Sequence, residues 1–460
     1  MNLDLFRIIV VIIVALSPIF ILRPKLLIYC YLALLFYFPN VGWGVAENEQ
    51  VFNLYGKGTG VLPLPLINIV LYFVFLLSLL RLYPEKEVRS SFNLRIYFWG
   101  INVLLLMFFS WGLMSGVELS EIISSRGLIN LFNMSVLSVV IIRAFSNNNE
   151  LQRLGNFIVF CALTRGLWGL VRLVLMGGDP ANVYFNVQAI DVQITFFDIN
   201  DSLISAFSLF FSAWMLMNCR KIRPALPSWK KIAYFLAIIV GLLIIILSHR
   251  RTSWGGLALV GLWFVWLQPW HKRFMLGIVA GVLGLLIVTQ VVTERFSTIS
   301  STKGNSGILY DVLSKKGKLR AEGRLAEFAL AWKHISEAPL TGVKPWGAID
   351  RGKGHDFIHS GFLHLWLKGG FFVLLFFCLM LLAYTLFALL KLKKIPPDKR
   401  GLGEAAFACI LFLTPTLMFG TPFIEFRTTQ MMGLMLALPY LVYGVWLAEE
   451  KSKLARANAV

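Results

Sequence analysis

The sequence predicts an all-α, polytopic membrane protein, and three observations support this fold class. Of its 460 residues, 58% are hydrophobic and only 15% are charged. Runs of about 20 apolar residues recur along the chain, the length that a helix needs to cross ~30 Å of hydrocarbon. These runs are continuous rather than alternating, which argues against an outer-membrane β-barrel.

Thirteen apolar runs, each bounded by polar residues, glycine or proline, are predicted to form helices. They cover residues 5–22, 26–42, 64–82, 96–114, 127–144, 154–176, 200–218, 232–248, 254–268, 274–293, 361–390, 405–420 and 430–448. Only three residues separate the first two runs, so one of them can be a partial span and the total is 12 or 13. No A-x-A-like cleavage site follows 5–22, which favours a retained helix over a signal peptide.

Positive charge gathers on alternate connections between these helices. The basic connections are 81–95, 219–231, 269–273, 390–400 and the tail after Glu450. The positive-inside rule places them in the cytoplasm and accounts for the net charge of +19 without a nucleic-acid partner. The other connections, 43–63, 115–125, 177–199, 248–253, 294–360 and 421–429, are then expected to face outward, into the periplasm of a Gram-negative cell.

We divide the chain into three parts. Residues 1–195 are N-terminal transmembrane helices, 196–390 form a core that includes the large outward loop 294–360, and 391–460 hold the last helices and a cytoplasmic tail. The sequence shows no internal repeat and no low-complexity tract.

Four arginines lie at or within apolar segments, where charge is costly and commonly marks a cavity, an ion pair or an anion site. Arg250 and Arg251 stand at an outward helix boundary, and Arg165 and Arg172 lie seven residues apart inside 154–176. We interpret Arg250 and Arg251 as candidate substrate-binding residues, and Arg165 and Arg172 as possible residues of a substrate cavity. The alternatives are snorkelling to outer headgroups, or pairing with an acid such as Asp179 or Asp191.

The outward loop contains an amphipathic helix. Apolar residues recur from Leu325 to Ile335 at helical spacing, and Ala338-Pro339 ends the pattern. Too short and too charged to span, this helix is expected to lie along the interface. Arg324 falls in its first turn, where a guanidinium beside free N–H groups suits a phosphate; bonding to loop carbonyls or Glu327 is the alternative. The loop holds 11 Lys and Arg against 7 Asp and Glu.

Three histidines, His355, His359 and His364, close this loop within ten residues. Their spacing would suit zinc, but the HExxH glutamate is absent, so we predict no metal and no cofactor. His359, at the run into the next helix, is the candidate general base for a hydroxyl, with His355 as a possible cavity residue. The alternative is an interface histidine that hydrogen-bonds the loop.

The segment FFDINDS (196–202) carries Asp198 and Asn200 at the mouth of a helix. It is not a D-x-D motif of metal-binding glycosyltransferases. Helix capping by Asp198 or Asn200 is the preferred interpretation, with a place in the substrate cavity as the alternative.

Four ordered segments together resemble the O-antigen ligase and polymerase superfamily of bacterial envelope glycosyltransferases. They are FFDINDSLISAFSLF (196–210), LSHRRTSWGGLALVG (247–261), GRLAEFALAWKHISEAPLTGVKPWG (323–347) and IHSGFLHLWLKGGFF (358–372). The chain departs from the family's usual pattern with Ser360 after His359 and Lys368 before the glycines. Of the two adjacent arginines, Arg251 fits the pattern better.

The resemblance implies a metal-independent, inverting glycosyltransferase of the bacterial inner membrane. Its donor would be a glycan on undecaprenyl diphosphate, held by Arg251 or Arg250 and by Arg324, and His359 would act on the acceptor hydroxyl. The acceptor would be lipid A–core in a ligase, or a second lipid-linked glycan in a polymerase. One dominant outward loop favours the ligase. A transporter of lipid-linked glycans, which would predict inverted repeats, and an envelope scaffold are the remaining alternatives.

Overall fold

The structure is a computed structural model. It describes residues 15, 18–37, 65–81, 94–123, 127–176, 186–187, 192–193, 197–221, 226–248, 250–269, 277, 328–342, 358–420, 423 and 425–457.

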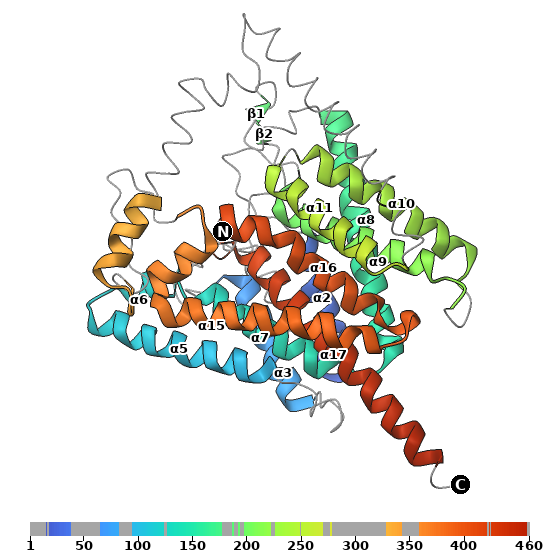
Figure 1. The fold of residues 1–460 in the computed structure, drawn as a ribbon, viewed down its shortest axis with the longest axis horizontal. Coiled ribbons are helices and arrows are strands. Elements are labelled where there is room, and N and C mark those ends of the chain that lie inside the picture. Colours follow the sequence, from blue (N-terminus) through green and yellow to red (C-terminus); the bar gives the residue numbers. More distant parts are fainter. Residues whose placement is uncertain are drawn as a thin grey trace, which may run out of the picture.

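The described chain is a bundle of apolar α-helices, which confirms the all-α membrane class (Figure 1). The helices are α2 (Pro24–Tyr37), α3 (Leu66–Arg81), α5 (Leu94–Met114), α7 (Ile129–Ala144), α8 (Asn148–Met176), α9 (Ile199–Met217), α10 (Ser228–Leu247), α11 (Arg251–Trp266), α15 (Gly361–Lys391), α16 (Pro397–Phe419) and α17 (Phe426–Ala457). Smaller elements are α6 (Leu119–Ile122), the 3-10 turn η1 (Leu392–Lys394) and one antiparallel pair, β1 (Asn186–Val187) with β2 (Val192–Gln193).

Each predicted run that falls on these residues corresponds to one helix. Six of the helices, α8, α9, α10, α15, α16 and α17, are long and apolar enough to cross a membrane, and the other five are shorter apolar helices. The predicted run 274–293 and most of 5–22 lie outside the described residues, so the total of 12 or 13 spans stays a prediction.

Three helices are longer than predicted. α8 begins at Asn148 rather than 154, because Asn147 Oδ1 accepts from the Glu150 N–H (3.0 Å) and orders the polar first turn. α16 begins at Pro397 rather than 405, with proline in the first turn, where no N–H is needed. α17 continues to Ala457, so the predicted tail is largely helical. An apolar run marks the buried part of a helix and misses such polar ends.

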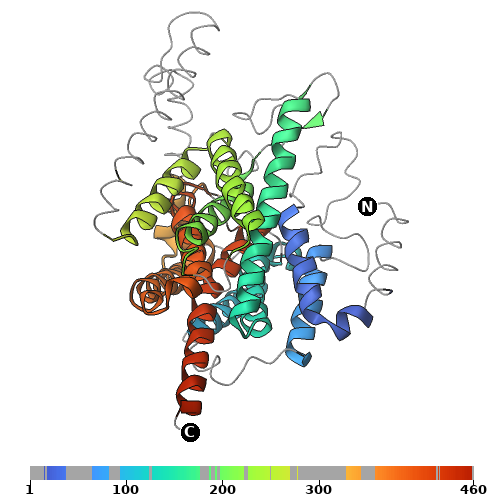
Figure 2. The ribbon, with the colours of Figure 1, turned by 90° about the vertical axis from the view of Figure 1, so that its right-hand side faces the viewer.

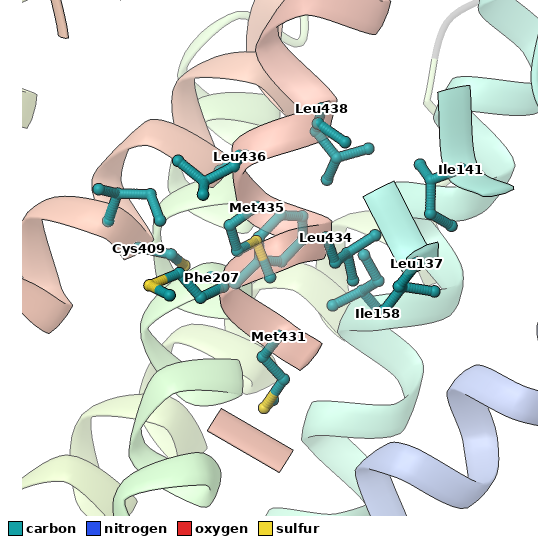
Figure 3. Close-up of a cluster of buried hydrophobic side chains, with 14 of the residues drawn as sticks. Leu137, Ile141, Ile158, Phe207, Cys409, Met431, Leu434, Met435, Leu436 and Leu438 are labelled. Carbon is teal, nitrogen blue, oxygen red and sulfur yellow. The ribbon is translucent and has the colours of Figure 1, made fainter. Parts of the chain in front are cut away.

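α9, α16 and α17 form the centre of the bundle. Their apolar windows are 72–83% buried, against 33% in α10 and 28% in α15. Figure 3 shows the contact: Phe207 of α9, Cys409 of α16 and Met435 of α17 lie together, beside Leu137 and Ile158 from α7 and α8. Apolar surface alone does not drive association in lipid, so close packing between the helices carries much of the stability.

Glycines allow the closest helix crossings. A Cβ on Gly256 would lie 2.4 Å from the Phe412 carbonyl oxygen, and one on Gly433 would lie 2.5 Å from that of Met134. Neither position can hold a larger residue unless α11 moves from α16, or α17 from α7.

The two ends of the bundle differ. At one end Lys25 pairs with Glu150 (2.5 Å), and Lys399 pairs with Glu449 (2.6 Å). The helical C-terminus projects from this end, opposite the last turns of α8 and the β1–β2 pair (Figure 2). We call it the basic end, because the predicted basic connections 219–231 and 390–400 border helices there. The other end, where α9, α11, α15 and α17 begin, is called the site end.

The predicted amphipathic helix is present at 328–337 and ends at Ala338. Its buried Ala331 and Ile335 pack with Ile358 and Leu367. The Trp332 ring, 57% exposed, meets Trp366 edge-on with 5.7 Å between ring centroids. The helix is therefore fastened to the first turns of α15.

A glycine kink in α15 makes room for this docking. Gly370 has φ +74°, and a Cβ there would lie 2.1 Å from the Leu340 carbonyl oxygen. The Pro339 carbonyl accepts from the Trp366 Nε1–H (2.9 Å) and from the Phe371 N–H (3.1 Å). Since only glycine adopts this backbone conformation without strain, Gly370 fixes where the chain after the amphipathic helix can rest.

Candidate functional site

The helices α9, α11, α15 and α17 are among those that begin at the site end, and contacts hold their first turns close together. Arg427 in the first turn of α17 pairs with Asp198 before α9. A Cβ on Gly361, the first residue of α15, would lie 2.9 Å from the Phe423 ring, which precedes α17. Gly255 in α11 faces Pro415 near the end of α16. Helix N-termini carry partial positive charge and unpaired N–H groups, so their convergence favours an anionic ligand.

Asp198 is the N-cap of α9, which confirms the capping interpretation. Its carboxylate accepts from the N–H groups of Asn200 and Asp201, both at 2.8 Å. The preceding residue, Phe197, has φ +43° and presses its ring against Gly169 of α8. A non-glycine residue in this region costs about 1–3 kcal/mol, so the surroundings hold this turn firmly.

Arg427 is completely buried and ties three helices together. It donates to the carbonyls of Leu35 and Phe36 at the end of α2, both at 2.9 Å, and to Asp198 Oδ2 at 3.1 Å. Its guanidinium also lies 3.8 Å from Asp201. Sequence analysis missed this residue, although an arginine two residues after Glu425 at the start of an apolar run was a usable signal.

Arg165 pairs with Asp201 inside the bundle. Its Nε and Nη2 donate to the two carboxylate oxygens at 3.1 and 3.4 Å, and both side chains are more than 90% buried. The paired acid in the described part of the chain is Asp201, in the first turn of α9, and the suggested partners Asp179 and Asp191 lie outside the described residues. Only the packing of α8 on α9 selects this partner. Arg165 holds the walls of the site together.

A second polar group joins α9 to the start of α17. Thr428 Oγ1 lies 2.7 Å from Asn200 Oδ1 and 2.9 Å from Glu425 Oε2. Asn200 Nδ2 faces Asp198 Oδ2 at 3.3 Å and Glu425 Oε2 at 3.5 Å. Asn200 was predicted as a cavity residue, whereas Glu425 and Thr428 were not. Glu425, Arg427 and Thr428 lie within four consecutive residues at the start of α17.

Arg250 differs from the other two arginines of the site. It is the N-cap residue of α11 and is partly buried. Its buried Nε has no hydrogen-bond partner among the described residues, and none of their carboxylates forms an ion pair with it. Its charge nevertheless acts on both Asp198 and Glu425. Of the three arginines of this cluster, Arg165 and Arg427 form ion pairs with described carboxylates, whereas Arg250 forms none.

The two carboxyl groups near Arg250 have opposite pKa shifts. Burial raises the pKa of Asp198, but Arg427, the Asp201 N–H, Arg250 and Arg165 outweigh it and hold that pKa below its ordinary value. Burial, followed by the negative charge of Asp198, raises the pKa of Glu425 against the opposing effects of Thr428, Arg250 and Arg427. Asp198 therefore stays charged, and Glu425 tends toward the neutral acid.

His359 lies at the entrance to α15, partly exposed. The next residue, Ser360, caps this helix by accepting from the Leu363 N–H (3.4 Å). His364 and Lys368 follow on one face of α15 and are buried, 3% and 1% exposed. His359 lies two residues before Gly361, where a Cβ would meet the Phe423 ring.

Four predicted site residues lie wholly or partly outside the described structure. Arg251 begins α11 and Arg172 lies in α8, but their side chains are outside what the structure describes, as are Arg324 and His355 altogether. Within the described ranges, no group of three or more His, Cys, Asp or Glu residues could hold a metal ion. The site brings together Arg165, Asp198, Asn200 and Arg250 from the prediction, and adds Asp201, Glu425, Arg427 and Thr428.

Part of the chain matches the model of a known protein family. The family model described as O-antigen ligase matches residues 236–378, from α10 to the middle of α15. This stretch includes Arg250 and His359, whereas the cluster around Asp198 and the start of α17 lie outside it. No curated protein matches the chain.

Proposed function

We propose that this chain, a member of the O-antigen ligase superfamily through its domain at 236–378, transfers a glycan from undecaprenyl diphosphate to an acceptor hydroxyl. The protein is a membrane glycosyltransferase of the ligase or polymerase type. The acceptor that we propose is lipid A–core, and the proposed location of the site is the periplasmic face of the inner membrane, since the basic end would face the cytoplasm.

The position of Arg250 carries this proposal. Its guanidinium has no carboxylate ion pair among the described residues, and it stands at the start of α11, at the end of the bundle where α9, α15 and α17 also begin. A diphosphate there would meet a cation and the first turn of α11, which has no side-chain cap, while its polyprenyl chain could lie along the apolar helices. Arg251 and Arg324 are proposed to complete the diphosphate site, and Arg165 supports its walls.

The proposed reaction is a single displacement at the anomeric carbon. The acceptor oxygen forms a bond to this carbon while its bond to the diphosphate oxygen breaks, and undecaprenyl diphosphate leaves with the electron pair. His359 takes the proton of the acceptor hydroxyl, and Arg250 stabilises the charge that grows on the leaving group. One displacement inverts the anomeric configuration, and no step needs a metal ion.

The test uses purified full-length protein, undecaprenyl-diphosphate glycan and lipid A–core, with EDTA present. We expect glycan transfer to lipid A–core by the wild type and by His334→Ala, a matched control in the amphipathic helix, and loss of at least about 100-fold in His359→Ala. Longer lipid-linked chains without a lipid A product would identify the polymerase. Donor moved across vesicles without transfer would instead identify a transporter and contradict the proposal.

A further inference from the structure

The hydrogen bonds around Asp198 and Glu425 indicate which of the two carboxyl groups carries a proton. Asp198 faces four donors: two backbone N–H groups on Oδ1, and Arg427 Nη1 and Asn200 Nδ2 on Oδ2. A protonated carboxyl could not accept all of them so well, and Arg427 is a permanent cation. Asp198 is therefore the ionised member of the pair.

The orientation of Asn200 follows from this charge. An ionised Asp198 Oδ2 can only accept, so the side of Asn200 that faces it is the NH₂ group, and Oδ1 faces Thr428. At 2.7 Å from Oδ1, the Thr428 hydroxyl donates its single proton to Asn200.

Glu425 competes with Asn200 for the proton of Thr428. Its Oε2 lies 2.9 Å from Thr428 Oγ1, which donates to both residues but carries a single proton. A neutral Glu425 has a proton of its own, so this competition no longer leaves one of the two contacts without a proton. Glu425 forms no ion pair with a described residue, and burial and Asp198 raise its pKa.

We infer that Glu425 carries a proton at neutral pH and that its ionisation controls how tightly the Arg250 site binds the anionic headgroup of the donor. This inference rests on the proposed function. An ionised Glu425 would place a second negative charge beside Arg250 and repel a diphosphate, whereas the neutral acid leaves the field of Arg250, Arg427 and the helix N-termini positive. Asp198, Asp201 and Arg165 face the cluster from α9 and α8, and Asp201 and Arg165 are paired with each other.

The sign of the pH effect follows by linkage. The headgroup binds better to protein with neutral Glu425, so binding favours proton retention, and donor affinity falls as pH rises through the pKa of Glu425. If the bound headgroup raises that pKa by one unit, affinity falls about tenfold over the transition. Glu425→Gln is neutral at every pH, so its affinity should not show this fall.

The experiment measures KM and kcat of the full-length protein for undecaprenyl-diphosphate glycan from mildly acidic to mildly alkaline pH. In the wild type and in Glu450→Gln, an exposed control at the other end of α17, we expect KM for the donor to rise about tenfold with pH. In Glu425→Gln that rise should disappear, while kcat and its pH profile match those of the wild type. A purely structural role would not separate KM from kcat in this way.

An infrared spectrum gives a readout that needs no activity. The carbonyl stretch of protonated carboxyl groups in the wild type at neutral pH should lose the contribution of one group in Glu425→Gln, since the other buried acids, such as Glu404, are the same in both proteins. If the wild type is active and Glu425→Gln shows the same rise of KM with pH, the inference about Glu425 is overturned, but the proposed function is not. A wild type without transfer would contradict the proposed function. If Glu425→Gln does not fold, the wild type is titrated alone from acidic pH upward. Complete loss of its carboxyl band before neutral pH is reached would overturn the inference.

Discussion

Replacing Arg427 by methionine tests whether the site end is held together by this one side chain. The change keeps an unbranched apolar body of similar length but removes the guanidinium. The carbonyls of Leu35 and Phe36 then lose their donor, and the Asp198 carboxylate loses its main counter-charge. Removing one partner of a buried ion pair typically costs about 3–5 kcal/mol, because the other charge stays buried without compensation.

We expect Arg427→Met to lower the free energy of unfolding by this amount. The assay is unfolding of the full-length protein in detergent micelles, followed by circular dichroism. Arg153→Met is the matched control, since Arg153 is exposed at the basic end of α8, and surface changes usually stay within about 0.5 kcal/mol.

A second variant separates lost charge balance from lost packing. Asp198→Asn keeps a good N-cap for α9 but removes the negative charge. The double variant with Arg427→Met has no buried unpaired carboxylate, so it should be more stable than Arg427→Met alone, with a coupling energy of about 0.5–3 kcal/mol. Equal losses in Arg427→Met and Arg153→Met, or additive effects in the cycle, would refute the reasoning.

Further predictions concern the docked amphipathic helix, the helix crossing below Arg250 and metal dependence. Gly370 has φ +74°, and a Cβ there would lie 2.1 Å from the Leu340 oxygen, so Gly370→Ala should detach residues 328–342 from α15 and make them susceptible to limited proteolysis. Gly261→Ala is the control, because a Cβ at Gly261 meets nothing within 4 Å, and it should not change the proteolysis pattern. Gly256→Ala places a Cβ 2.4 Å from the Phe412 oxygen, so α11, which begins after Arg250, should shift away from α16. The KM for the donor should then rise at least about threefold. An unchanged KM would show that this helix crossing does not set the position of Arg250. Prolonged dialysis against EDTA should leave transfer unchanged, and recovery only on adding a divalent cation would contradict the metal-free displacement.

Much of the scaffold was predictable because one rule dominates it. A membrane helix must be apolar over its span, so the runs located the helices, and Gly323 to Pro339 showed its amphipathic pattern in the letters alone. The N-cap role of Asp198 is likewise local, since a carboxylate before a helix meets that helix's own N–H groups.

The site itself was only partly predictable, because its contacts join residues far apart in sequence. Arg165 needed the packing of α8 on α9 before Asp201 became its partner. Glu425 and Thr428 act through Asn200, 225 and 228 positions away, and no spacing rule links them. The arginines were recognised as costly, but which of them lacks an ion pair depends on the positions of the carboxylates.

The measurement that tests the central claim most directly is donor binding by Arg250→Ala and by Arg153→Ala, compared with the wild type. Binding of undecaprenyl-diphosphate glycan to protein in nanodiscs would be followed with and without inorganic pyrophosphate as a competitor. We predict that Arg250→Ala binds the donor at least about tenfold more weakly and loses competition by pyrophosphate, while Arg153→Ala matches the wild type. Unchanged donor affinity in a folded Arg250→Ala protein would contradict the assignment of the diphosphate site.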